Sequence, residues 1–297
     1  MLRTSILASL SLLLSSCVVG EFDDEVGDGD LSLAGKANAT IRVVTHNVWK
    51  QPSAIQRAIN KAEAIDADVI ALQELCPGQK DAIVNTYGSQ WSIGVVAANR
   101  PALGGCPLPD GSQEVPFDLV AFRGKGGTPK AYDSIGGPER APGNKLVCVK
   151  FERGGVPVHA CSVHLISADW TDPVTGIAYN GEAVRQQQAT GLKRIAQDWF
   201  SGNQNHFGIL AGDFNSGADQ DPMDKIYSGQ LGGSGDFVEY NRNGNSRNGR
   251  VTVDKTSRKI DYIFFSANRA PVDGEAVDII ETDSDHHMVV STVKMKK

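Results

Sequence analysis

The sequence predicts an α/β fold, and three observations support this prediction. Short apolar runs of strand length recur along the chain, and segments with helical periodicity lie between several of them. The chain has 297 residues, of which 40% are hydrophobic and 22% are charged, so it can bury one large core. Six of the apolar runs also end in a carboxylate, amide or imidazole, which is a way of holding polar groups at the rim of a sheet.

Ten strands are expected from apolar runs bounded by polar, glycine or proline residues. Two of them, 145–152 and 157–166, are predicted to form a hairpin because Gly154 and Gly155 between them are a strong signal for a two-residue turn. In chain order the expected strands are 41–48, 68–74, 92–98, 117–123, 145–152, 157–166, 207–212, 259–266, 275–281 and 287–294.

Four helices are expected between these strands. The first, 52–65, has Pro52 in its first turn, where proline is well tolerated. The segment 182–200 has a stripe of apolar side chains at helical spacing, which indicates a packing face. Shorter helices are expected at 78–86 and 222–228, and the glycine- and asparagine-rich stretches 124–144 and 241–249 are expected to be loops.

The first 17 residues, MLRTSILASLSLLLSSC, have the pattern of a signal peptide. A basic Arg3 precedes an apolar run, and small residues lead to Cys17. The ending LLSSC resembles a bacterial lipobox, which predicts that Cys17 is lipidated and attaches the protein to a membrane. The alternative is ordinary cleavage nearby with an unmodified cysteine. We therefore expect an exported protein, either a lipoprotein of the bacterial cell envelope or a secreted protein.

Residues 18–39 are predicted to form a flexible acidic tether, because they are rich in acids, glycine and small residues without helical or strand periodicity. Their net charge is −5, and Arg3 adds +1 before them, so only −2 of the formal −6 falls on residues 40–297. A single domain is expected over 40–297, and it is nearly neutral. No apolar stretch long enough to span a membrane occurs after the leader.

Cys148 and Cys161 are predicted to form a disulfide across the hairpin. With the two glycines at its centre, residues pair when their numbers sum to 309, which places these cysteines opposite each other. Cys76 and Cys106 then pair by elimination. The alternative of free thiols in a reducing cytoplasm conflicts with the leader, and no cysteine or histidine spacing indicates a zinc site.

The polar residues at the ends of the apolar runs are the candidate functional residues. They occur in the phrases VVTHNVW, VIALQEL, HACSVHL, GILAGDFNS, KIDYIFF and SDHHMVV. Carboxylate and amide oxygens together with imidazoles suit a hard divalent cation and a phosphate ester. The candidates are Asn47, Glu74, His164, Asp213, Asn215, Asp261, Asp285 and His286.

These six phrases, in this order and over almost all of residues 41–293, resemble the endonuclease/exonuclease/phosphatase superfamily. GDFN and SDH are short motifs, but the ordered set is specific. The resemblance implies a four-layer sandwich of two mixed β-sheets flanked by helices. It also implies phosphoester hydrolysis that depends on Mg²⁺, with Mn²⁺ or Ca²⁺ as alternatives. It does not imply which ester is cleaved, because one fold hosts many substrates.

The resemblance also assigns roles to the candidates. Glu74 becomes the main metal ligand, with Asn47 and Asp285 completing the metal shell. His286 becomes the catalytic imidazole, and the carboxylate of Asp261 orients it and fixes its tautomer. A further set acts on the substrate, with Asp213 positioning the attacking water or protonating the leaving group, Asn215 holding a phosphoryl oxygen and His164 serving as a second histidine.

Two departures from the family pattern stand out. The acid that partners the second histidine in deoxyribonuclease-type enzymes is expected on the strand WSIGVVAANR, which has none. The basic residue that some nucleases carry after the LQE motif is also missing, because Cys76 and Pro77 follow there. Arg185, at the start of the long helix, is a candidate for contact with substrate phosphate; the alternative is a solvated surface charge.

The expected substrate is nucleic acid, with a lipid headgroup as the alternative. A nuclease needs a basic groove, and six basic residues between 242 and 259 permit one locally. A sphingomyelinase-like or phosphoinositide-directed enzyme needs an apolar hairpin for membrane contact, and no long aromatic loop is evident. A non-enzymatic binding protein is disfavoured because every motif carboxylate and imidazole is present. A monomer is expected. The basic residues are Arg242, Arg247, Arg250, Lys255, Arg258 and Lys259.

Overall fold

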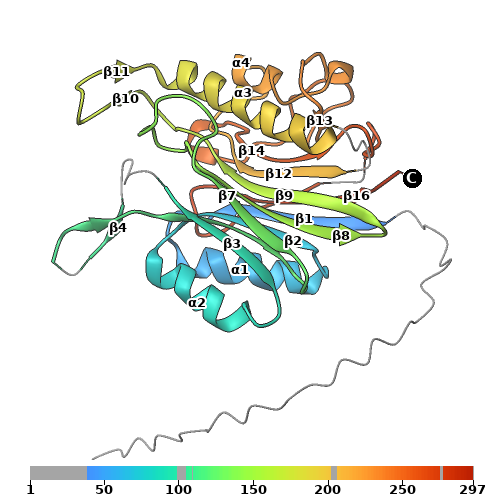
Figure 1. The fold of residues 1–297 in the computed structure, drawn as a ribbon, viewed down its shortest axis with the longest axis horizontal. Coiled ribbons are helices and arrows are strands. Elements are labelled where there is room, and N and C mark those ends of the chain that lie inside the picture. The colour runs from blue at the N-terminus through green and yellow to red at the C-terminus, as the bar shows by residue number, and fades with distance from the viewer. Residues whose placement is uncertain (1–38, 99–104, 109, 202–205, 275–276, 297) are drawn as a thin grey trace, which may run out of the picture. The chain divides into compact units, whose positions relative to one another are not determined.

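The computed structural model describes residues 39–98, 105–108, 110–201, 206–274 and 277–296. Two six-stranded sheets pack face to face, and helices cover the outer face of each sheet (Figure 1). The predicted four-layer sandwich of two mixed sheets is thereby confirmed.

The first sheet has the strand order β15-β16-β1-β2-β6-β3. Its central pair, β1 and β2, is parallel, and every other pair in it is antiparallel. The parallel pair is therefore joined by a crossover that contains a helix. The bounds are β1 Thr40–Asn47, β2 Val69–Leu75, β3 Ser92–Ala97, β6 Phe117–Phe122, β15 Asp278–Ile280 and β16 Met288–Lys294.

The second sheet has the order β13-β14-β12-β9-β8-β7. Here β9 and β12 are the parallel pair, and their neighbours are antiparallel. Each sheet thus places a parallel pair at or near its centre. The bounds are β7 Thr128–Tyr132, β8 Leu146–Arg153, β9 Val156–His164, β12 Phe207–Asp213, β13 Phe237–Val238 and β14 Asp261–Ser266.

The central strands are buried on both faces because they lie between the other sheet and a helical layer. Alternation along β1 and β2 divides their side chains between two cores. Val43 and Ala71 belong to the core shared with the second sheet, whereas Val44 and Ile70 pack in the core beneath the first helix. This burial explains why these strands read as nearly continuous apolar runs.

Helices α1, Pro52–Ala64, and α2, Pro77–Tyr87, cover the first sheet. Helix α3, Gly181–Phe200, covers the second sheet and lies beside the single turn α4, Asp221–Asp224 (Figure 1). The Asn180 side chain caps α3 by accepting a hydrogen bond from the Ala183 amide. Two short 3₁₀ turns follow, η1 at Gly229–Leu231 and η2 at Asp254–Thr256.

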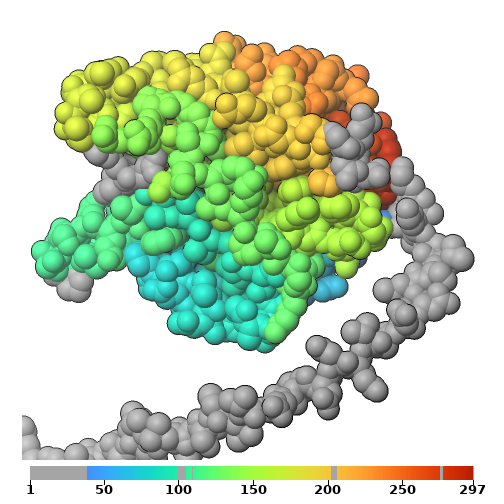
Figure 2. All heavy atoms as spheres, in the orientation of Figure 1, coloured from blue at the N-terminus to red at the C-terminus, as the bar shows by residue number. Residues whose placement is uncertain are grey.

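Two small hairpins project from the same end of the sandwich, as Figures 1 and 2 show. One consists of β4, Cys106–Pro107, and β5, Gln113–Glu114. The other consists of β10, Trp170–Thr171, and β11, Ala178–Tyr179. Neither was expected from the sequence, because strands of two residues have no detectable periodicity.

Both predicted disulfides are present. In the β8–β9 hairpin Arg153 pairs with Val156 and Cys148 pairs with Cys161, which is the predicted register. The second disulfide joins Cys76, at the start of α2, to Cys106 in the β4–β5 hairpin. It therefore fixes that hairpin to the end of the strand that carries Glu74.

Two expectations about secondary structure were wrong. The stretch 124–144 contains a strand, β7, which was missed because its residues are mostly exposed at the edge of the sheet and show no apolar run. The helix expected at 222–228 is only the turn α4, because Tyr227 pairs with Phe237 instead of continuing the helix.

The predicted signal peptide, 1–17 with Cys17, lies outside the described residues, as does nearly all of the predicted tether, 18–39. Among the residues that the structure does describe, no helix combines the length and the apolar character that crossing a membrane requires.

Candidate active site

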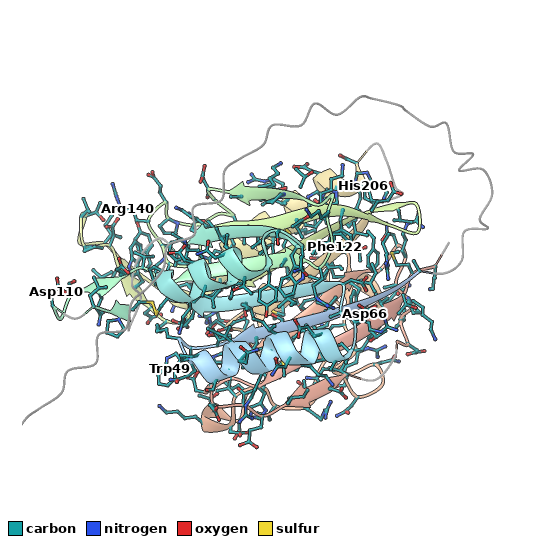
Figure 3. All side chains as sticks on the ribbon, turned by 90° about the horizontal axis from the view of Figure 1, so that it is seen from below. Trp49, Asp66, Asp110, Phe122, Arg140 and His206 are labelled. Carbon is teal, nitrogen blue, oxygen red and sulfur yellow. A yellow bond between two sulfur atoms is a disulfide. The ribbon has the colours of Figure 1, made fainter. Side chains whose placement is uncertain are left out.

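The candidate residues come together because the strands that carry them end on the same side of the sandwich. Asn47, His164 and Asp213 are the last residues of β1, β9 and β12. Asp261 begins β14, which runs antiparallel to β12, so it reaches the same end. In Figure 3 the labelled Trp49, which follows β1 closely, lies toward the end that also carries Asp110 and Arg140, away from Asp66 and His206.

Asp213 is the centre of the group. Its Oδ2 accepts hydrogen bonds from the amides of Asn47, at 3.2 Å, and Asn215, at 3.1 Å. The Nε2 atoms of His164 and His286 each lie 3.8 Å from the same oxygen. Two imidazoles, one at the end of β9 and one just before β16, therefore face the same carboxylate.

Burial raises the pKa of Asp213 to about 6, and the neighbouring charge of Asp261 adds to the increase. The positive charges of His286 and His164 act in the opposite direction. A carboxylate with this pKa can exchange a proton near neutral pH, which suits a group that acts on a water molecule.

His286 is held by a chain of hydrogen bonds. Its Nδ1 lies 3.0 Å from both oxygens of Asp261, and the Thr252 hydroxyl donates to Asp261 Oδ2 at 2.7 Å. Burial lowers the pKa of His286, but the charges of Asp261 and Asp213 outweigh burial and raise it to about 10. On the far side, His46 Nε2 lies 3.1 Å from the His286 carbonyl oxygen. The ring is thus fixed with Nε2 toward Asp213.

His287 faces another direction. Its Nε2 lies 3.0 Å from Asp254 Oδ2, in the exposed turn η2. The two adjacent histidines therefore have different partners, and only His286 faces the group around Asp213.

His164 has a partner that the sequence analysis missed. Its Nδ1 lies 3.4 Å from Oδ1 of Asp118, a buried residue on β6. We expected such an acid on β3 and found none there, but β6 is the neighbouring strand of β3. Burial lowers the pKa of His164, but the charges of Asp118, Asp213 and Glu74 outweigh burial and raise it to about 9. The only sequence signal was an acid inside the apolar run FDLVAF.

Glu74 reaches the group through an irregularity in β2. The β2–β6 register shifts between Leu72 and Leu75, and Glu74 has a φ of 61°, in the left-handed region that is unusual for residues other than glycine. Its Oε1 accepts from the Asn47 amide at 3.2 Å. The bulge therefore turns this carboxylate toward Asn47 and His164 instead of toward the face dictated by alternation. Such strain is typical of functional sites.

Lys50 occupies the other oxygen of Glu74, at 2.6 Å from Nζ to Oε2. Burial acts to raise the pKa of Glu74, but the charges of His164 and Lys50 outweigh burial and lower it. A basic residue therefore lies beside Glu74 although none follows the LQE motif, and it comes from the segment after β1. A helical periodicity or a strand pattern could not have indicated this contact.

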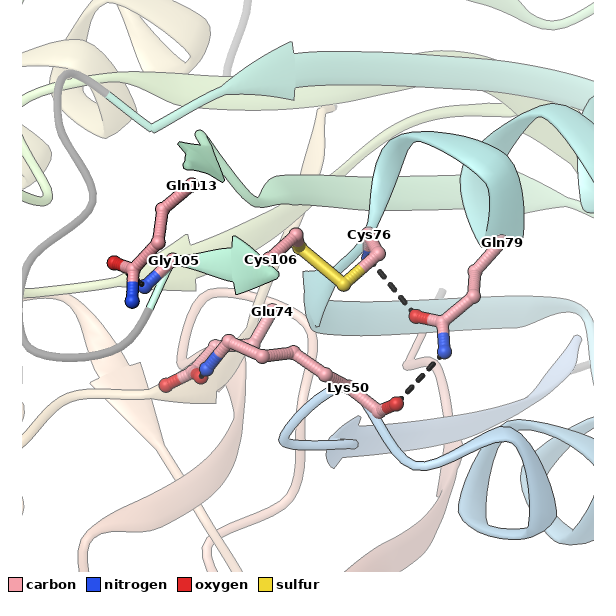
Figure 4. Close-up of a disulfide and its surroundings, with 7 residues drawn as sticks. All are labelled: Lys50, Glu74, Cys76, Gln79, Gly105, Cys106 and Gln113. Carbon is pink, nitrogen blue, oxygen red and sulfur yellow. Dashed lines mark hydrogen bonds and ion pairs between the residues drawn. A yellow bond between two sulfur atoms is a disulfide. The ribbon is translucent and has the colours of Figure 1, made fainter. Parts of the chain in front are cut away.

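The disulfide at Cys76 supports this arrangement (Figure 4). The Cys76 amide donates to Gln79 Oε1 at 2.9 Å, and Gln79 Nε2 donates to the Lys50 carbonyl at 2.7 Å. Lys50 has a φ of 64°, so its backbone is held in the left-handed region. The cross-linked start of α2 therefore holds both partners of the Lys50–Glu74 ion pair.

The donor set fits a hard divalent cation. The carboxylates of Glu74 and Asp213 both accept hydrogen bonds from the Asn47 NH2 group, and carboxylate oxygens are ligands that Mg²⁺ prefers. The Asn47 side-chain oxygen accepts from the Trp49 backbone amide at 3.1 Å, so the part of Asn47 in a metal shell stays a prediction. Among the described residues, Asp213, Asp261 and His286 each offer one potential ligand atom, and these atoms lie within 4.8 Å of one another. We regard Asp261 as an orienting group, because His286 and Thr252 already occupy its oxygens.

Asp285 and Arg185 lie at the edge of the group. Asp285 is exposed, and its Oδ1 lies 3.5 Å from the Ser284 hydroxyl, so its part in a metal shell stays a prediction. Arg185 is buried, and its Nη1 donates to the carbonyls of Ile166 and Ser167, just after His164. It is not the solvated surface charge that was the alternative.

Most of the basic residues between 242 and 259 stabilise the fold. Lys259 is buried and donates to Glu239 at 2.6 Å, and Arg247 stacks on Tyr227 and pairs with Asp224. Arg242 and Arg250 donate to backbone carbonyls. These four do not form the basic groove that their sequence spacing permitted, which leaves Lys255 and Arg258.

Comparisons with known proteins agree with the fold. No curated protein matches the chain. Among solved structures, the catalytic domain of human Nocturnin with bound sulfate is 16% identical with a TM-score of 0.63, covering 86% of this chain and 95% of that one. TDP2 from D. rerio complexed with a single-strand DNA product is 17% identical with a TM-score of 0.52, covering 86% and 98%.

An endonuclease/exonuclease/phosphatase family protein from Leptotrichia buccalis is 15% identical with a TM-score of 0.58, covering 86% of this chain and 100% of that one. These likenesses show the fold. The family itself is shown by the sequence. The sequence model of the family matches residues 44–286, a range that includes every candidate from Asn47 to His286. The chain belongs to the Endonuclease/Exonuclease/phosphatase family.

Proposed function

We propose that the protein is an exported, Mg²⁺-dependent nuclease that hydrolyses phosphodiester bonds of DNA or RNA. The observation that carries the proposal is the arrangement of two oriented imidazoles around one carboxylate, with Glu74 and Asn47 beside it. Hydrolysis of a phosphodiester needs an activated water, neutralisation of developing charge and a proton for the leaving oxygen. This site has a candidate for each requirement.

In the proposed mechanism Asp213 accepts a proton from the attacking water, for which its raised pKa is suitable. His286, oriented by Asp261, donates a hydrogen bond to a phosphoryl oxygen, and Asn215 holds the same group. His164, oriented by Asp118, gives a proton to the leaving oxygen. Glu74 and Asn47, with Asp285 as a further ligand, would hold Mg²⁺, which would neutralise the negative charge that develops on the phosphate.

Nucleic acid as the substrate is supported by the likeness to TDP2, which was solved with a single-strand DNA product. Export is supported by the leader sequence and by the two disulfides, since disulfides persist in oxidising compartments. We further propose that the exported protein is a monomer that is attached to the membrane through Cys17.

A substrate panel tests the function. Plasmid DNA, RNA, sphingomyelin and phosphoinositides are incubated with the protein, with and without Mg²⁺ and chelator. Cleavage of a nucleic acid that stops with chelator is expected, and Glu74→Gln should need far more Mg²⁺ than the wild type, because a neutral amide binds the cation weakly. Turnover unchanged by chelator rejects the metal assignment.

A lipid headgroup is the second candidate, and one observation favours it. The β10–β11 hairpin next to the site exposes Val174 by 66% and Ile177 by 51%, while Trp170 stacks on Tyr179 at its base. Exposed apolar side chains on a projecting hairpin suit contact with a membrane. If lipid is the substrate, replacing Val174 and Ile177 by serine should reduce activity on vesicles and leave activity on DNA unchanged.

A further inference from the structure

A hollow with a volume of about 460 Å³ lies beside the candidate active site. Its walls come from the segments that carry catalytic candidates. Residues 217–220 follow Asn215 closely, and residues 257–259 come just before Asp261. The third wall is Arg185 on α3, which lies beside α4 in Figure 1.

Arg185 joins the hollow to the active site. Its Nη1 donates to the carbonyls of Ile166 and Ser167 at 3.0 and 3.3 Å. Those two residues line the smaller pocket that contains Glu74 and His164. The charge of Asp213 also acts on Arg185. A polymeric substrate bound at the catalytic residues can therefore extend along the protein surface into the hollow.

Two guanidinium groups face this hollow without a carboxylate partner. Within the described part of the chain, neither Arg185 nor Arg258 forms an ion pair; Arg258 donates to the Gln220 side chain at 3.0 Å. Arg185 is 8% exposed, and its Nε is buried with no hydrogen-bond partner. Burial and then the charge of Arg258 lower the pKa of Arg185, so the two cations repel each other.

An anion between these groups would relieve the repulsion and use the unpaired donors. A guanidinium suits phosphate because its planar donors match two oxygens. Asn248 and Ser257 add neutral polar groups to the lining, and Lys259 directs its ammonium away to Glu239. The one acid of the lining, Asp219, is exposed to solvent.

We propose that this hollow is a second phosphate subsite, which binds the backbone phosphate next to the scissile phosphodiester. Arg258 is the main contact, and Arg185 contributes charge while it fixes the wall between the two sites. The proposal rests on the proposed nuclease function and deepens it. It assigns the substrate to polynucleotides with at least two phosphates and disfavours single-diester lipids.

The test compares a substrate with one phosphate to a substrate with several. Bis(p-nitrophenyl) phosphate has a single diester, and short single-stranded oligonucleotides have many. Arg258→Gln should lower the ratio of oligonucleotide to bis(p-nitrophenyl) phosphate kcat/KM by about tenfold, through KM, which equals about 1.4 kcal/mol. The slope of log KM against log salt should fall by about one. Lys125→Gln, which removes an equal charge from the exposed loop after β6, is the matched control and should change neither.

A chemical substitution in the substrate makes the test independent of folding. A neutral methylphosphonate at the phosphate next to the cleaved bond should lower the wild-type kcat/KM on the oligonucleotide about as much as Arg258→Gln does. The same methylphosphonate should have little further effect on the kcat/KM of Arg258→Gln. If Arg258→Gln does not fold, Arg258→Lys, which retains the charge, and the methylphosphonate series on the wild type still decide the matter.

The outcomes separate two failures. If wild type cleaves oligonucleotides but Arg258→Gln leaves the ratio unchanged, or the methylphosphonate effect is the same in both proteins, the subsite is rejected and the nuclease assignment stands. If the wild type cleaves bis(p-nitrophenyl) phosphate but no oligonucleotide, the nuclease assignment fails and the subsite fails with it.

Discussion

The two histidines of the candidate active site are held with different rigidity. His286 lies 3.0 Å from both oxygens of Asp261, which is itself held by Thr252. His164 lies 3.4 Å from one oxygen of Asp118, and that oxygen also faces the Glu74 amide at 3.4 Å. The charges of the neighbouring carboxylates raise the pKa of both rings, to about 10 for His286 and about 9 for His164.

The difference indicates how the two sheets contribute. His286 comes from the segment before β16 in the first sheet, and its orienting acid comes from the second sheet. His164 and Asp118 reverse this relation, with the histidine on the second sheet and the acid on the first. Each pair therefore ties one sheet to the other across the site, and both imidazoles converge on Asp213.

The largest effect should follow loss of the rigid histidine. His286→Ala should reduce turnover by at least about a hundredfold, which is the lower end of what removing one oriented hydrogen-bond donor to the developing charge costs. His287→Ala is the control and should have little effect, because His287 pairs with the exposed Asp254. Steady-state kinetics on the same substrate measure both. A larger loss of turnover in His287→Ala than in His286→Ala would mean that the assignment is one residue off and that His287 is the catalytic histidine.

His164→Ala should have a smaller effect, about tenfold on turnover, because a loosely held acid contributes less than a well-oriented one. The informative measurement uses two esters that differ in leaving group. A proton donor to the leaving oxygen matters least for p-nitrophenolate, so the loss should shrink on bis(p-nitrophenyl) phosphate. Equal losses on both esters would contradict the role of His164 as the acid.

Changing the orienting acids sharpens the comparison. Asp261→Asn should reduce turnover by about tenfold and Asp118→Asn by about threefold, since each loosens a ring without removing it. The order of the two effects matters more than their size. If Asp118→Asn is the more damaging change, the shorter contacts of Asp261 do not reflect a greater catalytic contribution.

The sequence predicted much of this site because three of its residues end regular strands. Asn47, His164 and Asp213 are the last residues of their strands, and parallel strand ends meet at one edge. The disulfide of Cys148 and Cys161 followed from the same regularity, through the hairpin register.

What the sequence could not predict depends on irregular backbone or on contacts between distant segments. Lys50 reaches Glu74 through two left-handed residues, 49 and 50, and Glu74 itself lies on a bulge. Asp118 sits within a strand, where alternation alone does not distinguish a solvent-facing acid from one that faces the site. The basic cluster was misleading because sequence proximity does not show that Lys259 is buried against Glu239.

The smallest expected effect concerns protonation in the presence of chelator. The pKa values of both histidines are raised above the ordinary value of about 6.5, so their charged forms stabilise the folded state fully below that pH. This contribution is lost as pH rises through about 9 for His164 and about 10 for His286. Thermal unfolding of wild type should therefore shift to lower temperature as pH rises through this range.

NMR titration of the imidazole signals distinguishes the two rings. Both rings should titrate well above pH 6.5, and Asp118→Asn should lower the pKa of His164 more than that of His286, because Asp118 is the first of the charges that raise the pKa of His164. The fold must be intact for the comparison to hold, which the dispersion of the backbone spectrum checks. If Asp118→Asn lowers both values equally, the two imidazoles titrate as one unit through Asp213 and the distinction between a rigid and a loose histidine does not hold.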